Sequence, residues 1–107
     1  MQKKVERMKS RSVIDNAEKL LAKFITLSEG IINSNGISEV KHFFEHGEHE
    51  VAFEGLVIEL SENGLDPRNF NYSDWKNLAL EYGLDKESVF KADFWSRFKH
   101  WGKAYQE

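Results

Sequence analysis

Residues 48–63 read EHEVAFEGLVIELSEN, and this segment is the most informative about the fold. Its apolar residues recur at intervals of three and four, which places one set on a single helical face: Ala52, Phe53, Leu56, Val57 and Leu60. Val51 and Ile58 lie almost opposite that face. A helix that is apolar on two sides packs between other elements. We therefore expect residues 48–63 to form the central helix of the protein.

The segment at residues 13–32 has the same helical periodicity, with its apolar residues on one broad face. This pattern predicts a helix of about six turns. Ser10 or Ser12 can cap its start, because a serine hydroxyl accepts a hydrogen bond from a free amide of the first turn. We expect Asn-Ser-Asn-Gly at residues 33–36 to end the helix, since Asn and Gly tolerate a left-handed backbone.

A second helix is predicted to open after Ser38 and to stop at Gly47. Its core-facing residues are Val40, Phe43 and Phe44.

After the central helix, Asn63-Gly64 is the predicted C-cap, with Leu65 as the apolar residue that follows it. Asp66-Pro67 predicts a turn, because the residue before proline avoids helical backbone angles. A fourth helix should run from about Ser73 to Gly83. Its apolar side carries Trp75, Leu78, Ala79 and Tyr82.

The C-terminal residues are rich in aromatic and basic side chains, a mixture that could suggest nucleic-acid binding. The aromatic residues, however, are spaced by three or four and form one helical stripe, which predicts core packing: Phe90, Phe94, Phe98, Trp101 and Tyr105. Trp95 lies off this stripe and is the candidate for a surface aromatic.

These segments predict an all-α fold, a compact bundle of four to five helices forming a single domain over residues 1–107, with residues 1–9 flexible. The chain has no cysteine, which excludes disulfides and thiolate metal sites. It has no apolar run long enough for a membrane span and no apolar segment after the basic residues at its start. We expect a soluble cytoplasmic protein.

The net charge of −3 hides a strong asymmetry along the chain. Residues 38–66 contain eight acidic residues against Lys41 alone, whereas residues 1–23 contain seven Lys or Arg. Such an acidic block repels nucleic acid and attracts a basic partner. It is also compatible with solvated helix faces that have no partner.

Residues 42–49, HFFEHGEH, contain His-x-x-Glu-His, the reversed form of a zinc-peptidase signature. His42 and His46 could reach one zinc ion and Glu45 could activate a bound water. A catalytic site also needs a third protein ligand and a rigid helix, but Gly47 ends the helix directly after His46. A zinc-dependent hydrolase is therefore a remote alternative, and we expect no catalytic residue, metal or cofactor.

Residues 47–62, GEHEVAFEGLVIELSE, follow the pattern Gly-Glu-x-x-x-Ala-x-Glu-x-Leu-x-x-x-Leu-x-Glu after a helix that ends in aromatic residues. This resembles a segment that recurs in small bacterial immunity proteins, notably the MafI-like family and similar contact-dependent growth inhibition immunity proteins. The resemblance implies a cytoplasmic antitoxin that binds the toxic C-terminal domain of a secreted polymorphic toxin, often a nuclease, in a 1:1 complex. It implies no direct contact with nucleic acid or membrane.

The acidic block supplies a mechanism for such an inhibitor, because nucleases bind phosphates in basic grooves that carboxylates can occupy instead. Aromatic residues supply the anchors of many protein interfaces, although core packing explains such rings equally well. The predicted partner-binding residues are Glu45, Glu50, Glu54, Asp66, Asp74, Tyr72 and Trp75. We expect charge reversal at Glu50 and Glu54 to slow association. The alternative is a regulatory helical module that binds nucleic acid or protein through its basic ends.

Overall fold

The computed structural model describes residues 11–88 and 90–105, with only the backbone for residues 11–15. The predictions for residues 1–9 and for the Ser10 cap lie outside the described residues. In the described part the chain forms five α-helices and no strand: α1 (Arg11–Ser28), α2 (Ser34–Glu45), α3 (His49–Glu62), α4 (Tyr72–Glu81) and α5 (Phe94–Ala104). The predicted all-α fold is confirmed.

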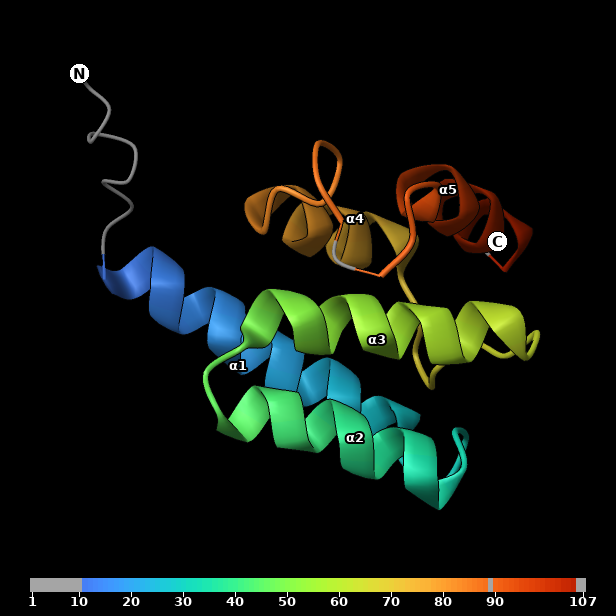
Figure 1. The fold of residues 1–107 in the computed structure, drawn as a ribbon, viewed down its shortest axis with the longest axis horizontal. Helices are drawn as coiled ribbons and strands as arrows, with labels where there is room; N and C mark the ends of the chain where they lie inside the picture. The colour runs from blue at the N-terminus through green and yellow to red at the C-terminus, as the bar shows by residue number, and fades with distance from the viewer. Residues whose placement is uncertain (1–10, 89, 106–107) are drawn as a thin grey trace.

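Helix α3 is the central element of the bundle, where it contacts α1, α2 and α5 (Figure 1). Helices α1 and α2 lie on one side of it, and α4 and α5 lie on the other (Figure 1). Six residues of α3 are buried, and five of them are the apolar set predicted from the sequence. The Cα radius of gyration is 13.6 Å, close to the roughly 13 Å expected of a compact chain of about 100 residues.

Glycines in the left-handed conformation end α2, α3 and α4, as predicted. Gly47 has φ +78°, Gly64 has φ +65° and Gly83 has φ +74°. After Gly47, the amide of Glu48 donates to the carbonyl of Phe43 at 2.9 Å, which satisfies a carbonyl of the last turn of α2. This tight turn sends α3 back antiparallel to α2.

The predicted boundary between the first two helices is wrong. Helix α1 ends at Ser28, two residues before Gly30 with φ +84°, and Ile32 lies beyond it, buried in the loop. Asn33 then starts α2, because its side-chain oxygen accepts the Gly36 amide at 2.8 Å. Residues 33–36 therefore begin a helix rather than end one, and Ser38 lies inside α2.

An aromatic cluster joins α4 and α5 to the rest of the core. Trp75 stacks on Phe24 of α1, with ring centroids 4.2 Å apart, and Trp101 lies across Trp75 at 5.8 Å. The Trp101 indole N–H donates to the carbonyl of Leu65 at 2.8 Å, which fixes α5 against the end of α3. Trp95, the predicted surface aromatic, is half-buried against this core.

The predicted aromatic stripe holds for Phe94, Phe98 and Trp101, which are buried. It fails at Phe90, since α5 begins only at Phe94 and Phe90 lies in the preceding loop with 48% of its surface exposed. Tyr105 at the other end is also exposed. The spacing of aromatic residues continues on the N-terminal side of α5, but the backbone directly before Asp93 is not helical. Spacing alone therefore places the start of this helix too early.

Candidate functional site

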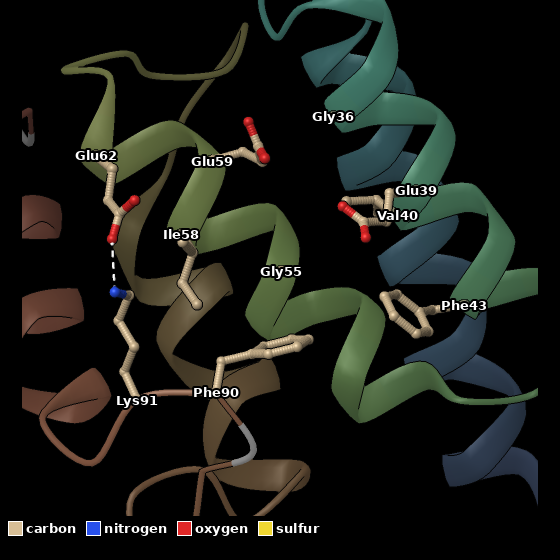
Figure 2. Close-up of a pocket in the computed structure, with 10 residues that line it drawn as sticks. All are labelled: Gly36, Glu39, Val40, Phe43, Gly55, Ile58, Glu59, Glu62, Phe90 and Lys91. Atoms are coloured by element: carbon tan, nitrogen blue, oxygen red, sulfur yellow. Dashed lines mark ion pairs between the residues drawn. The ribbon is translucent and has the colours of Figure 1, made fainter.

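The strongest candidate site is a groove between α2 and α3. Each helix contributes four residues at spacings of i, i+3, i+4 and i+7, so each set forms one stripe along its helix. The stripe on α2 consists of Gly36, Glu39, Val40 and Phe43, and the stripe on α3 consists of Gly55, Ile58, Glu59 and Glu62. Phe90 and Lys91 from the loop before α5 complete the lining of a hollow of about 360 Å³ (Figure 2).

Two glycines leave room for this groove. The ring of Phe90 lies over Gly55, where an added Cβ would be 3.9 Å from the Phe90 ring (Figure 2). On the facing helix, an added Cβ at Gly36 would come within 2.7 Å of the Glu59 carboxylate. The absence of a side chain at Gly36 thus lets Glu59 lean from α3 against the first turn of α2. A carboxylate is favourable beside a helix N-terminus, where free amides carry partial positive charge.

Glu54 holds the loop that covers the groove. Its Oε2 accepts hydrogen bonds from the backbone amides of Phe90 at 2.8 Å and Lys91 at 3.4 Å. The side chain of Glu54 is fully buried, so these amide donors help to compensate the cost of removing a carboxylate from water. A core residue of α3 therefore positions both residues of the groove rim that come from outside α2 and α3.

The charge within the groove is negative. Glu39 and Glu59 point into the gap from opposite helices, while Glu62 pairs with Lys91, whose Nζ lies 3.0 Å from Oε2 (Figure 2). Three carboxylates thus face one ammonium group, which leaves two negative charges without a compensating cation in the lining. Phe43 and Phe90 add two aromatic rings with centroids 6.2 Å apart. The arrangement suits a cation attached to an apolar segment.

The predicted partner-binding residues fall into two groups. Glu45, Glu50, Asp66 and Asp74 are exposed, as a contact surface requires. The prediction that Glu54 points outward is wrong, because the loop before α5 folds over it. Tyr72 and Trp75 are also buried, with 7% and 1% of their surface exposed, and belong to the aromatic core. Because they are buried, the side chains of Glu54, Tyr72 and Trp75 cannot contact a partner protein directly.

The four exposed acids do not form one patch. Glu45 and Glu50 lie on either side of the turn between α2 and α3. Asp66 follows the opposite end of α3, which at 1.5 Å per residue is about 20 Å away. Asp74 lies in the first turn of α4. The groove residues Glu39, Glu59 and Glu62 were absent from the prediction, because the spacing of Gly and Glu marks a stripe on each helix without showing that the two stripes face each other.

The three histidines of residues 42–49 make contacts within the protein that do not form a metal site. The Nδ1 atom of His46 lies 2.8 Å from the carbonyl oxygen of His42, and their rings are 4.3 Å apart. His49 packs beside Phe44 and lies 3.9 Å from a Glu18 carboxylate oxygen. Within residues 16–88 and 90–105, no three His, Asp or Glu side chains are placed to hold a metal ion. This geometry gives the zinc alternative no support.

A second hollow, of about 540 Å³, lies where α5 meets the end of α3. Two of its polar groups are already used within the protein: the Trp101 indole donates to Leu65, and the Tyr105 hydroxyl donates to the Gly64 carbonyl at 2.7 Å. Its guanidinium, on Arg97, pairs with Asp93 at 2.8 Å. This hollow is a joint between helices, and the groove on α2 and α3 is the better candidate for binding.

Comparisons of the chain with protein families, with curated proteins and with solved structures each found no match. The geometry of the groove and the charge around it are therefore the observations that bear on function. No helix in the described part of the chain has the length and apolar character needed to cross a membrane.

Proposed function

We propose that this chain is an immunity protein, an antitoxin that binds and blocks the toxic C-terminal domain of a secreted polymorphic or contact-dependent growth inhibition toxin. The observation that carries the proposal is the acidic surface of α2, α3 and the turns that flank α3. Of the eight acids in residues 38–66, only Glu54 is buried, and the other seven remain at least partly exposed. Seven carboxylates on adjoining segments suit a basic partner surface.

The proposed mechanism is competition with phosphates. A nuclease holds its substrate through Lys and Arg in a basic groove. Carboxylates held on packed helices can pair with those residues and prevent the nucleic acid from entering. The groove between α2 and α3 is the part of this surface that combines charge with apolar contact, and apolar contact contributes the affinity that screened surface charge does not.

The surface charge would also set the rate of association. Opposite fields accelerate encounter by a factor of 10 to 1,000 at low salt, an advantage for a protein that has to capture a toxin before it acts. Glu45 and Glu50 are both exposed near the same turn, so they replace the predicted pair of Glu50 and Glu54 as the residues to test. Reversing both charges should slow association roughly tenfold at low salt, with a smaller effect at high salt.

The proposal predicts that a secreted toxin with a variable C-terminal domain is encoded beside this chain, and the test uses that domain. That domain is expressed in bacteria with and without the chain, and growth is followed. Co-expression should restore growth, and the purified proteins should form a 1:1 complex. The proposal is overturned if the chain neither protects the cells nor binds the toxin domain.

A further inference from the structure

We infer that the groove between α2 and α3 is a receptor for one arginine side chain, presented by a partner protein next to an apolar residue. The inference deepens the proposed function and rests on it for the identity of the partner. The chemistry of the groove itself follows from the residues that line it.

The size of the groove limits what it can accept. A hollow of about 360 Å³ is at the small end of the range for ligand sites. It has room for one or two side chains and not for a whole helix. A phosphate or a nucleic acid is excluded by the sign of the charge, because Glu39, Glu59 and Glu62 face the space.

The groove already holds one cation of this chain. Lys91 reaches Glu62 from the loop, with 3.0 Å between Nζ and Oε2. Glu39 and Glu59 remain on the other side of the hollow, near Gly36 (Figure 2). A second cation is therefore attracted by the negative charge at this end, whereas a neutral side chain gains no such attraction and an acidic side chain is repelled.

The aromatic residues distinguish arginine from lysine. Phe90 is 48% exposed, and its backbone amide donates a hydrogen bond to the buried carboxylate of Glu54. Phe43 lies 6.2 Å away across the groove. A guanidinium group is planar and weakly hydrated, so it stacks on an aromatic ring while donating two hydrogen bonds to one carboxylate. An ammonium group offers no such planar face and keeps its water more firmly.

The aliphatic residues of the lining are the reason to expect an apolar residue beside the arginine of the partner. Ile58, which is partly buried, and Val40, which is almost fully buried, form the aliphatic part of the lining, and the ring of Phe90 lies over Gly55 (Figure 2). A leucine or similar residue beside the arginine would cover this surface and remove Phe90 from water. The partner segment is thus basic and apolar together, which separates it from a purely polycationic tail.

The probe is a capped pentapeptide, Gly-Leu-Arg-Leu-Gly, compared with versions that carry lysine or uncharged citrulline in place of arginine. Each peptide is titrated into the isotopically labelled chain, and amide signals of Gly36, Gly55 and Lys91 are followed by NMR. The arginine peptide should bind with a dissociation constant on the order of 1 mM, as suits a single side chain. The lysine peptide should bind roughly fivefold more weakly, and the citrulline peptide tenfold or more weakly.

Variants of the chain locate the binding. Glu59→Gln should weaken the arginine peptide roughly tenfold, and Phe90→Ala roughly threefold. Glu87→Gln makes the same chemical change on an exposed loop residue outside the groove and should leave affinity unchanged. Thermal melts confirm that each variant is folded. Equal binding of the arginine and citrulline peptides, or unchanged affinity in folded Glu59→Gln, overturns the inference.

Measurements with the toxin domain distinguish a failure of this inference from a failure of the proposed function. If the arginine peptide binds and Glu59→Gln weakens that binding as expected, the groove is established even where the chain fails to neutralise the toxin. If the chain neutralises the toxin while Glu59→Gln and Phe90→Ala leave its affinity for the toxin unchanged, the antitoxin proposal stands and the groove inference fails.

Discussion

The carboxylate of Glu54, on the central helix α3, accepts a hydrogen bond from the backbone amide of Phe90, with 2.8 Å between Oε2 and the nitrogen. Glu54 is fully buried, whereas nearly half of the Phe90 surface is exposed. A buried charge is expensive unless strong donors surround it. Here that charge fixes a loop without regular secondary structure and presents an aromatic ring at the edge of the groove.

We expect Glu54→Leu to destabilise the protein by about 2 kcal/mol, because it leaves the amides of Phe90 and Lys91 without this acceptor. Glu54→Gln should cost less, since its amide oxygen can still accept. Urea denaturation gives the change in unfolding free energy, and hydrogen exchange reports on the Phe90 amide. Glu87→Gln is the control for a loop carboxylate. If the Phe90 amide of Glu54→Leu is as protected from hydrogen exchange as that of the original chain, Glu54 does not anchor this loop.

Two helical glycines are expected to respond oppositely to alanine. A Cβ at Gly102 would collide with the ring of Tyr72, whereas a Cβ at Gly55 would meet nothing closer than 3.9 Å. Gly102→Ala should therefore destabilise by about 1–3 kcal/mol through overpacking. Gly55→Ala should stabilise by about 0.5–1 kcal/mol, because alanine loses less backbone entropy in a helix. Thermal and urea unfolding of both variants measure these changes in stability, and changes of the same sign would contradict the prediction.

The source of the Gly102 effect can be checked by a double-mutant cycle. If the collision with Tyr72 is the cause, adding Gly102→Ala to a Tyr72→Ala background should cost much less than adding it to the original chain. An equal cost in both backgrounds would locate the effect elsewhere in α5.

Much of the helical architecture could be predicted because its signals are local. The apolar spacing of residues 52–60 marks the buried face of α3, and each of Gly47, Gly64 and Gly83 follows a helix in the left-handed conformation expected of it. Asn33 shows the limit of such signals. An Asn-x-x-Gly segment can end one helix or cap the next, and only the bond from Gly36 to the Asn33 side chain decides between them.

The groove could not be predicted, because it depends on contacts between distant parts of the chain. Glu54 and Phe90 are 36 residues apart, and nothing near Glu54 in the sequence indicates that a loop will cover it. The stripes beginning at Gly36 and Gly55 are visible as spacings within each helix. Their relative register follows from the turn at Gly47, and it is this register that brings Glu39 and Glu59 to face each other.

Arg68 is expected to stabilise the end of α1. Its guanidinium donates to the carbonyls of Thr26 at 2.9 Å and Glu29 at 3.0 Å, and α1 has no basic residue in its own last turn. A cation at this position adds hydrogen bonds to carbonyls at the end of the helix and interacts favourably with the helix dipole. Arg68→Ala should lower the unfolding free energy by about 1 kcal/mol.

Arg68→Lys should recover only part of that loss, because one ammonium group cannot reproduce the planar fork that reaches both carbonyls. Lys86→Ala removes an exposed cation elsewhere and serves as the control in the same urea titrations. Lysine as effective as arginine would show that charge alone, and not the paired geometry, stabilises this end of α1.

Tyr82 is expected to make stability fall in alkaline solution. Burial, followed by the nearby charges of Glu18, Glu50 and Glu81, raises the pKa of Tyr82 from 10.0 to about 12. Between these values the unfolded chain has lost the phenolic proton and the folded chain has kept it, so unfolding releases a proton. The contribution of Tyr82 to stability is therefore complete below pH 10.0 and is lost as the pH rises toward about 12.

Tyr82→Phe should remove this contribution, so its stability should fall less than that of the original chain between about pH 9 and about pH 11.5. Glu50→Gln should lower the pKa of Tyr82, because it removes one of the charges that oppose ionisation. Ultraviolet titration of phenolate formation measures the pKa, and urea unfolding across the same range measures stability. A Tyr82→Phe variant whose stability falls as steeply as that of the original chain would mean that other groups produce the alkaline loss.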